Sequence, residues 1–300
     1  MSKLSSWISA FRLRTLPLSL SGIIIGSCLA AYNGLFDMAI FVLAMLTTVG
    51  FQILSNLAND YGDGVKGTDN ENRLGPQRAI QSGSITPTQM MEAIKINILI
   101  VIVLSLSLIY VAMGHEYLVF SIIFIVLAAA CVYAAINYTM GDSAYGYRGL
   151  GDVFVFIFFG LVSVMGSYFL YAKQLDHVLV LPAIALGLLS IGVLNLNNMR
   201  DIDSDTLSNK ITIAVRLGKQ KAKIYHYVLV GGAILCGALF GILYYNSPYN
   251  LIFVLAFIPL VKHLISVKKA KTSEDLDKQL KPLALTTFLF SLLLGIGHIL

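Results

Sequence analysis

Residues 56–78 read NLANDYGDGVKGTDNENRLGPQR and lie between two long apolar runs. This polar stretch carries four acidic and three basic residues. If the helix that enters the stretch continues past Asn56, then Asn56, Asp60 and Asp63 are spaced i, i+4 and i+7 and share one helix face. Oxygen atoms gathered on one face are suitable ligands for a hard divalent cation. The spacing therefore predicts part of a metal site at the end of this helix.

A second polar stretch, NLNNMRDIDSDTLSNK at residues 195–210, follows another long apolar run. Here Asn197, Asp201 and Asp205 are spaced i, i+4 and i+8 and form a second face of the same kind. The simpler alternative is a set of solvated loop charges paired with lysines, and such surface pairs contribute under ~1 kcal/mol each. However, seven of the sixteen acidic residues fall in the two stretches, at helical spacing and next to asparagines. This pattern favours two carboxylate faces that bind magnesium and hold a diphosphate between them.

Hydrophobic residues make up 57% of the 300 residues, charged residues only 12%, and the mean hydropathy is +0.79. These values exclude an ordinary soluble domain and indicate a polytopic membrane protein. We expect one all-α integral membrane domain over residues 1–300, because in lipid each helix satisfies its own backbone hydrogen bonds. Nine apolar runs are long enough, at about 17 to 25 residues, to cross a bilayer of ~30 Å. They cover residues 16–33, 38–58, 89–113, 118–138, 152–172, 178–198, 223–245, 249–267 and 282–299.

The positions of the basic residues explain the net charge of +5. Twenty of the 21 Lys and Arg residues lie toward one side of the membrane, in the N-terminal segment, in the even-to-odd loops or in the span ends that adjoin these loops, as Lys95, Lys223 and Lys262 do. Lys173 is the exception. The positive-inside rule therefore predicts a cytoplasmic N-terminus, cytoplasmic polar stretches and an external C-terminus. This asymmetry accounts for the charge without a nucleic-acid partner.

The N-terminal segment contains WISAFRLRTLP at residues 7–17. We expect a short interfacial helix there, with Trp7 at the depth of the lipid headgroups and with Arg12 and Arg14 facing lipid phosphate or substrate. The first apolar run lacks a small-residue cleavage site, so we interpret it as a retained helix and not as a signal peptide.

Three tyrosines, Tyr138, Tyr145 and Tyr147, lie in the short glycine-rich loop between the fourth and fifth spans. They could form an interfacial aromatic belt. Alternatively, their ring faces could stabilise a cation that develops near the membrane surface.

Basic residues flank both acidic faces and suit the oxygen atoms of a diphosphate. Magnesium commonly binds through one or two carboxylates together with substrate phosphates, so each face could hold one ion. The remaining phosphate oxygens would be bound by basic side chains. Together these groups would stabilise a departing diphosphate. The basic candidates are Lys66, Arg73, Arg78, Lys210 and Arg216.

The two polar stretches resemble the two aspartate-rich motifs of the UbiA superfamily of intramembrane prenyltransferases. The first likeness is carried by NDYGD at 59–63, Asp69, GPQRA at 75–79 and Ser82-Gly83, and the second by NNMRDIDSD at 197–205 and KITIAVRLG at 210–218. The loop with Tyr138-Thr139, YGY at 145–147 and GLG at 149–151 is similar to that of the 1,4-dihydroxy-2-naphthoate polyprenyltransferases of menaquinone synthesis.

This resemblance implies nine transmembrane helices around a central cavity that opens toward cytoplasmic catalytic loops, with the prenyl tail leaving laterally into lipid. It also implies roles for particular residues. Two Mg2+ ions would be bound by Asp60, Asp63, Asp201 and Asp205, with Asn56, Asn59 and Asn197 in support. Lys66, Arg78 and Lys210 would hold diphosphate, Tyr138 or Tyr145 would face the cation, and Asp69, Arg73, Arg200 and Arg216 would complete the substrate site.

The implied reaction is the Mg2+-dependent transfer of a polyprenyl chain from polyprenyl diphosphate to 1,4-dihydroxy-2-naphthoate, with loss of the carboxylate, to give demethylmenaquinone. The implied location is the plasma membrane of a bacterium. Within the superfamily, 4-hydroxybenzoate or haem is the alternative acceptor. A transporter for a small anion or a metal is a different class, but it would place polar residues near the bilayer midplane. The acids of this chain cluster near one surface.

Overall fold

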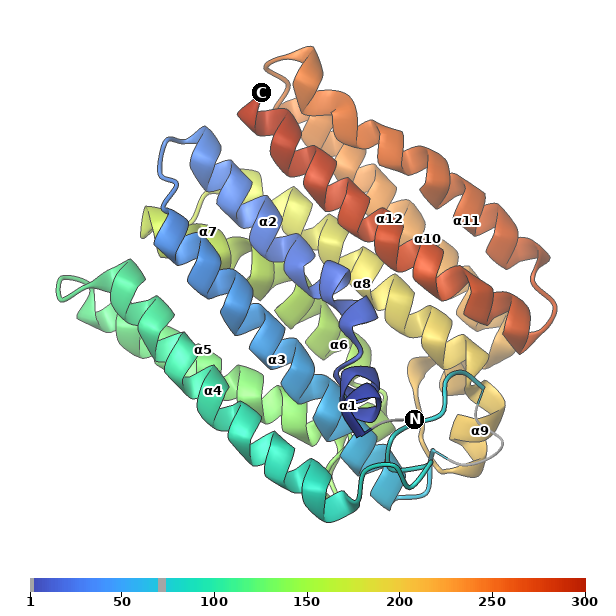
Figure 1. Ribbon diagram of the computed structural model, residues 1–300. Helices are drawn as coiled ribbons and strands as arrows, with labels where there is room; N and C mark the ends of the chain where they lie inside the picture. Colours follow the sequence, from blue (N-terminus) through green and yellow to red (C-terminus); the bar gives the residue numbers. More distant parts are fainter. Residues whose placement is uncertain (1–2, 70–73) are drawn as a thin grey trace.

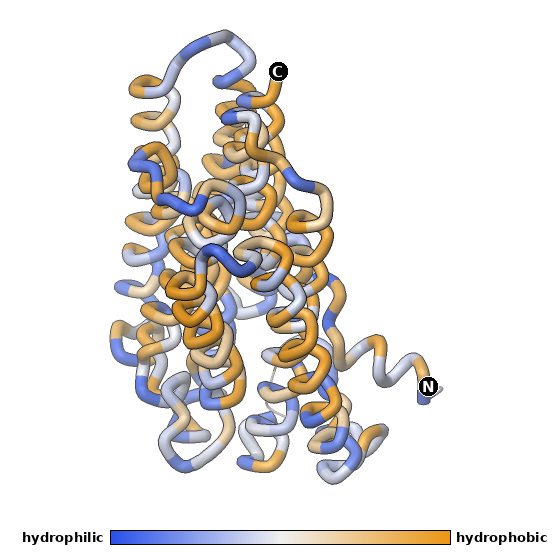
Figure 2. Tube along the Cα trace, turned by 90° about the vertical axis from the view of Figure 1, so that its left-hand side faces the viewer, coloured by the Kyte–Doolittle hydropathy of each residue, from blue (hydrophilic) through white to orange (hydrophobic). Residues whose placement is uncertain are grey.

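The computed structural model describes residues 3–69 and 74–300. Within these residues it is all-helical and contains nine helices that are long and apolar enough to cross a membrane. The helices run side by side in one bundle (Figure 1). Hydrophobic residues cover most of their length, and hydrophilic residues are more frequent in the connecting segments (Figure 2). The predicted all-α membrane fold with nine spans is therefore confirmed.

The first five spans are formed by α1 with η1 and α2, then by α3, α4, α5, and α6 with η3 and α7. Their bounds are α1 Lys3–Phe11, η1 Leu13–Thr15, α2 Leu16–Tyr32, α3 Met38–Val65, α4 Pro87–Met113, α5 Leu118–Asn137, η2 Tyr145–Arg148, α6 Gly151–Val155, the π-helical η3 Phe156–Gly166 and α7 Ser167–Ala172. The last four spans and their flanking helices are η4 His177–Leu179, α8 Val180–Arg200, α9 Ile202–Leu207, α10 Ile213–Leu243, η5 Pro248–Ala256, α11 Phe257–Lys269 and α12 Ser273–Ile299.

Two helices begin well before the membrane spans that the sequence predicted. α10 begins at Ile213, where the Thr212 hydroxyl accepts a hydrogen bond from the Val215 backbone N–H. α12 begins at Ser273, after a capping box between Thr272 and Asp275. The helices therefore extend beyond the predicted apolar spans, which begin at residues 223 and 282, because a capped polar turn can be helical without being apolar.

Small residues let the helices around α8 approach one another closely. α8 packs against η3, α10 and α12, and α12 packs along α2. At the α8–η3 crossing, a Cβ added to Gly160 would lie 2.7 Å from the Gly187 Cα. Membrane helices associate through such close van der Waals packing, since lipid provides no hydrophobic driving force between them. α8 is thereby fixed in the interior of the bundle, with its polar end at one surface.

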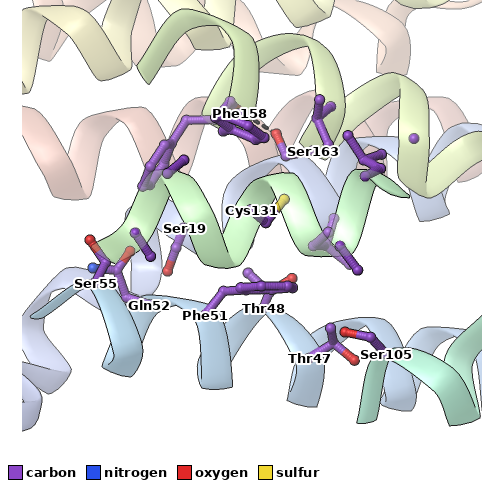
Figure 3. A pocket seen from close by; sticks show the side chains of 18 of the residues that line it. Ser19, Thr47, Thr48, Phe51, Gln52, Ser55, Ser105, Cys131, Phe158 and Ser163 are labelled. Carbon is purple, nitrogen blue, oxygen red and sulfur yellow. Dashed lines mark hydrogen bonds between the residues drawn. The ribbon is translucent and has the colours of Figure 1, made fainter. Parts of the chain in front are cut away.

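A cavity of about 360 Å³ lies among α2–α8, which agrees with the central cavity that the resemblance implied. Its wall combines aromatic and aliphatic residues with hydroxyl groups such as those of Ser19, Thr47 and Ser163 (Figure 3). Cys131 on α5 and Phe158 on η3 both line it. The cavity is therefore suited to an apolar chain.

Candidate active site

The polar ends of α3 and α8 lie close together. α3 continues to Val65, so Asn56, Asp60 and Asp63 share one helix, as their spacing predicted. α8 ends at Arg200, and Asp201 links it to the short helix α9. Helical hydrogen bonding still passes through this junction, because the Asp205 N–H donates to the Asp201 carbonyl at 2.8 Å.

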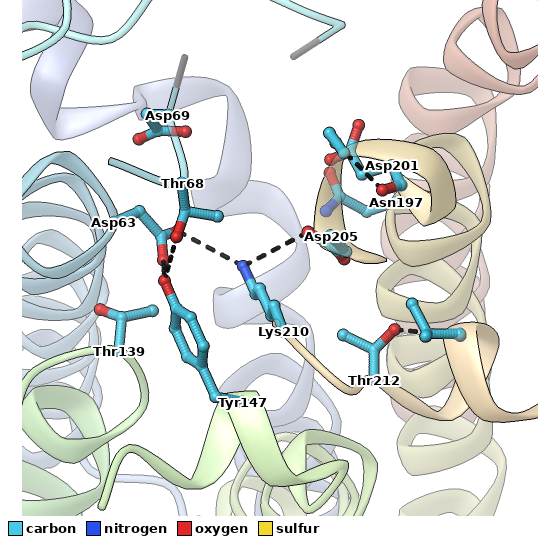
Figure 4. A network of polar contacts seen from close by, with 12 residues as sticks. Asp63, Thr68, Asp69, Thr139, Tyr147, Asn197, Asp201, Asp205, Lys210 and Thr212 are labelled. Atoms are coloured by element: carbon cyan, nitrogen blue, oxygen red, sulfur yellow. Dashed lines mark hydrogen bonds and ion pairs between the residues drawn. The ribbon is translucent and has the colours of Figure 1, made fainter. Parts of the chain in front are cut away.

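Lys210 connects the two polar ends. Its Nζ lies 3.5 Å from Asp63 Oδ2 on α3 and 4.0 Å from Asp205 Oδ1 on α9 (Figure 4). All three side chains are largely buried. The two motifs, about 140 positions apart in sequence, therefore meet at one ammonium group.

Lys210, Asp63 and Asp205 form the polar centre of the site. Burial and neighbouring charges determine the protonation of Asp205 and Lys210. Burial raises the pKa of Asp205 to about 7, although Lys210 favours its ionised form. Burial alone would lower the pKa of Lys210, but Asp63 and Asp205 outweigh that effect and raise it. Lys210 is therefore a firmly charged group between two carboxyl groups.

Tyr147 also contacts Asp63 and Lys210, although its spacing in the sequence predicts no contact with either residue. Its hydroxyl donates to Asp63 Oδ1 at 2.8 Å and lies 2.6 Å from the Thr68 Oγ1 (Figure 4). The Lys66 Nζ lies 4.3 Å and the Lys210 Nζ 5.3 Å from its ring centroid, distances at which a cation is attracted to an aromatic face. The only sequence signal was its position in the tyrosine-rich loop.

Asp60 has an unusual environment for a carboxylate. Its side chain is 1% exposed, and Oδ2 accepts a hydrogen bond from the Ala79 backbone N–H at 3.3 Å. Oδ1 is buried and has no hydrogen-bond partner among the described residues. A buried polar atom of this kind calls for an explanation such as a bound ion. It adjoins a second cavity, of about 240 Å³, which is also lined by Arg12 and Arg78.

Arg200 forms an ion pair with Asp201 of the second motif. Its Nε and Nη2 donate to the two carboxylate oxygens of Asp201 at 2.7 and 2.5 Å, and Nη2 also donates to Asn197 Oδ1 at 2.9 Å. Its Nη1 donates to Asp277 Oδ1 of α12 at 2.7 Å. Asp201 is thus neutralised by a bidentate pair.

Tyr138 and Tyr145 line the main cavity, near the polar centre. Their rings meet edge to face at 5.3 Å, and Tyr145 stacks on Phe154 at 3.9 Å. The Tyr145 hydroxyl donates to the Ala134 carbonyl at 2.7 Å. Burial raises the pKa of Tyr138, just past the end of α5, to about 12, while the nearby Lys210 opposes this shift. Tyr138 therefore lies between the apolar cavity and the polar centre.

Several other predicted site residues hold the surrounding loops. The Asn56 amide donates to the Phe11 carbonyl at 2.9 Å and accepts from Gln52 at 3.2 Å, which ties α3 to the N-terminal segment. Asn59 Oδ1 accepts from the Thr139 hydroxyl at 3.4 Å.

Some of the predicted basic residues also contact the surrounding loops. Lys66 Nζ donates to the Gly141 carbonyl at 2.7 Å, and Arg216 Nη2 donates to the Arg148 carbonyl at 2.6 Å. Arg78 Nε lies 3.9 Å from the buried carboxylate of Asp69. Arg73 lies outside the described residues.

In the part of the chain that the structure describes, no three carboxylate, imidazole or thiol groups converge into a ready-made metal cluster. Lys210 instead pairs with Asp63 and Asp205, and Arg200 pairs with Asp201. The carboxylates of such a site can bind a divalent cation, and the oxygen atoms of a phosphate ligand strengthen that binding.

Comparison with known proteins agrees with this geometry. Residues 19–294 match the model of the UbiA prenyltransferase family. The chain is 43% identical to the 1,4-dihydroxy-2-naphthoate octaprenyltransferase of Escherichia coli K12, over 97% of this chain and 96% of the relative. It is 40% identical to the protein of the same name from Haemophilus influenzae, over 98% and 96%.

Solved structures share the fold at low sequence identity. A UbiA homologue from Archaeoglobus fulgidus, bound to DMAPP and Mg2+, superposes with a TM-score of 0.71 at 12% identity and covers 98% of this chain and 99% of its own. An apo UbiA homologue from Aeropyrum pernix K1 gives a TM-score of 0.70 at 15% identity, over 95% and 97%. The resemblance read from the two motifs is confirmed, and the chain belongs to the UbiA prenyltransferase family.

Proposed function

We propose that this protein transfers a polyprenyl chain from polyprenyl diphosphate to 1,4-dihydroxy-2-naphthoate, in the synthesis of menaquinone. Relatives that are 40 to 43% identical over nearly their whole length are named for this reaction, with octaprenyl as the transferred group. The observation that carries the proposal is the meeting of the two acidic motifs at Lys210, beside the aromatic end of an apolar cavity.

Magnesium is the proposed cofactor, with two ions expected. The site fits them because Asp60 has a buried carboxylate oxygen without a hydrogen-bond partner among the described residues, and because the donor set is made of oxygen atoms. A structural relative holds Mg2+ together with DMAPP. When bound, the ions would neutralise charge on the departing diphosphate. The proposed ligands are Asp60, Asp63, Asp201 and Asp205, supported by Asn56, Asn59 and Asn197.

The basic side chains would hold the diphosphate. Lys210 is central, because it already lies between Asp63 and Asp205 and stays charged. Phosphate oxygens brought to this point would replace one carboxylate as its partner. We propose the same role for Lys66 and Arg78, and binding of the substrates by Asp69, Arg73, Arg200 and Arg216.

In the reaction, the bond between prenyl C1 and the diphosphate oxygen breaks, and its electron pair leaves with the diphosphate. The faces of Tyr138 and Tyr145 would stabilise the resulting allylic cation, since aromatic faces attract positive charge. The naphthoate ring then forms a carbon–carbon bond to C1 and loses its carboxylate as CO2. The product is the quinol form of demethylmenaquinone.

The proposed location is the plasma membrane of a bacterium, with the catalytic loops and the N-terminus in the cytoplasm and the C-terminus outside. α1 and the carboxyl terminus lie at opposite ends of the bundle, which supports this orientation (Figures 1 and 2). The excess of Lys and Arg in the N-terminal segment and the even-to-odd loops places that side of the bundle in the cytoplasm.

An acceptor assay tests the function. Membranes that contain the protein are incubated with a labelled polyprenyl diphosphate, Mg2+ and either 1,4-dihydroxy-2-naphthoate or 4-hydroxybenzoate, and the product mass is measured. We expect a prenylated, decarboxylated naphthalene product that disappears when EDTA is added. Turnover of 4-hydroxybenzoate alone would contradict the acceptor assignment.

A further inference from the structure

Arg200 is a junction of three segments that lie far apart in the sequence. Its guanidinium binds Asp201 of the second motif and Asp277 of α12. The backbone of Gly75, in the loop after the first motif, lies against the same group, because a Cβ built there would be 3.4 Å from Arg200 Nη1. The side chain of Arg200 is only 4% exposed. Changes at Asp277 can therefore reach the second motif through this one side chain.

Asp201 cannot keep all of its hydrogen bonds to Arg200 and also bind a metal ion in the same orientation. Both of its oxygens accept hydrogen bonds from Arg200, whereas a metal ligand must direct at least one oxygen to the ion. If Asp201 were the only acid beside Arg200, an Asp201 that turned away would leave Arg200 buried without a counterion. Removal of one partner from a buried ion pair is strongly unfavourable, and arginine cannot release its proton to avoid the cost.

Asp277 provides Arg200 with a second carboxylate, so that Arg200 keeps a counterion when Asp201 turns to a metal ion. Its Oδ1 accepts from Nη1 at 2.7 Å, and the arginine nitrogens bonded to Asp201 are Nε and Nη2. The two acids thus occupy different edges of the guanidinium. Arg200 can stay neutralised by Asp277 while Asp201 turns to an ion.

We propose that Asp277 is a positioning residue for the second metal-binding motif: it holds the charge of Arg200 and so frees Asp201 to bind a divalent cation. The proposal rests on the proposed function, which assigns Asp201 to the metal. It gives a role in the reaction to the polar first turns of α12, where Glu274 and Lys278 are exposed.

A purely structural role makes a different prediction. If Asp277 only tied α12 to α8, its loss would lower the stability of the metal-free protein and leave the metal affinity of the folded molecules unchanged. If Asp277 counters Arg200, its loss strengthens the hold of Arg200 on Asp201, and the metal must compete with that pair.

The test measures the binding of Mn2+ to purified protein in detergent by electron paramagnetic resonance, first with the metal alone, where the carboxylates are its protein ligands, and then with inorganic diphosphate, whose oxygen atoms should strengthen the binding. The variants are Asp277→Asn, which keeps an acceptor oxygen but loses the charge, and Asp277→Glu, which keeps the charge. Glu274→Gln is the matched control, because it removes the same charge from the first turn of α12 at an exposed position.

We expect Asp277→Asn to weaken Mn2+ binding by about tenfold or more, the usual cost of changing a group that orients a metal ligand. Asp277→Glu should restore most of the affinity, and Glu274→Gln should change it by less than about twofold, because exposed charges are screened. The thermal midpoint of metal-free Asp277→Asn should stay close to that of the wild type. Wild-type Mn2+ affinity in Asp277→Asn, or an equal loss in Glu274→Gln, would overturn the proposal.

Prenyl transfer by the wild-type protein is measured in the same preparations. If the wild type does not transfer prenyl groups, the proposed function fails, whatever the Mn2+ affinities are. If it is active and Asp277→Asn binds Mn2+ normally, the assignment of Asp277 alone is wrong.

Discussion

The ammonium group of Lys210 lies 3.5 Å from Asp63 Oδ2, although the two residues are 147 positions apart in the sequence. This contact joins the end of α3 to the segment after α9 (Figure 4). It places a permanent positive charge where the two acidic motifs meet. The chemistry proposed for this protein depends on that charge.

Lys210→Met should reduce prenyl transfer by about 10² to 10³, because a buried charge directed at the departing group is lost. The measurement is kcat with naphthoate acceptor and saturating polyprenyl diphosphate. Lys219→Met is the control, since Lys219 is 62% exposed and pairs with Asp203, which is 73% exposed. Comparable losses in the two variants would show that the position of Lys210 is not special.

Tyr147→Phe should lower activity by removing the hydroxyl that orients Asp63, while the ring remains near Lys66 and Lys210. The loss of hydrogen bonds to Asp63 and Thr68 should also cost about 1 kcal/mol of stability. Kinetics and thermal unfolding measure the two effects. Tyr133→Phe, at an exposed position on α5, should change neither. Unaltered kinetics in Tyr147→Phe would remove Tyr147 from the site.

Asp60→Asn should separate function from stability. The substitution keeps the shape of the side chain but removes a buried negative charge, so the metal-free protein should be at least as stable as the wild type. Prenyl transfer should fall by about 10² or more, because an ion ligand is lost. Thermal unfolding without metal and Mg2+-dependent turnover are the two measurements. A destabilised but fully active variant would mean that Asp60 is structural.

Cys131→Phe should narrow the cavity at its α5 wall. We expect the KM for a long polyprenyl diphosphate to rise, with a smaller effect on a short donor such as geranyl diphosphate, because the added ring occupies space that only the long chain needs. Ile242→Phe on the exposed side of α10 is the control and should behave as the wild type. Equal effects on long and short donors would indicate a general loss of packing.

The sequence by itself determined the membrane fold and the two motifs. Nine apolar runs predicted nine helices because length and hydropathy are local properties that lipid enforces on each segment. The spacing of Asn56, Asp60 and Asp63 held because α3 continues through them without a break. The first turns of α10 and α12 lie before the predicted apolar spans, because they are fixed by the caps at Thr212 and Thr272 and not by hydropathy.

Only the tertiary structure decided which partners these side chains take. Asn56 binds the N-terminal segment, Tyr147 binds Asp63, and Arg200 is shared between Asp201 and Asp277. Spacing along one helix specifies a face, but the packing of other helices specifies what that face meets. The contact between Lys210 and Asp63 exists because α8 is buried beside η3, α10 and α12, which brings two distant helix ends to one place.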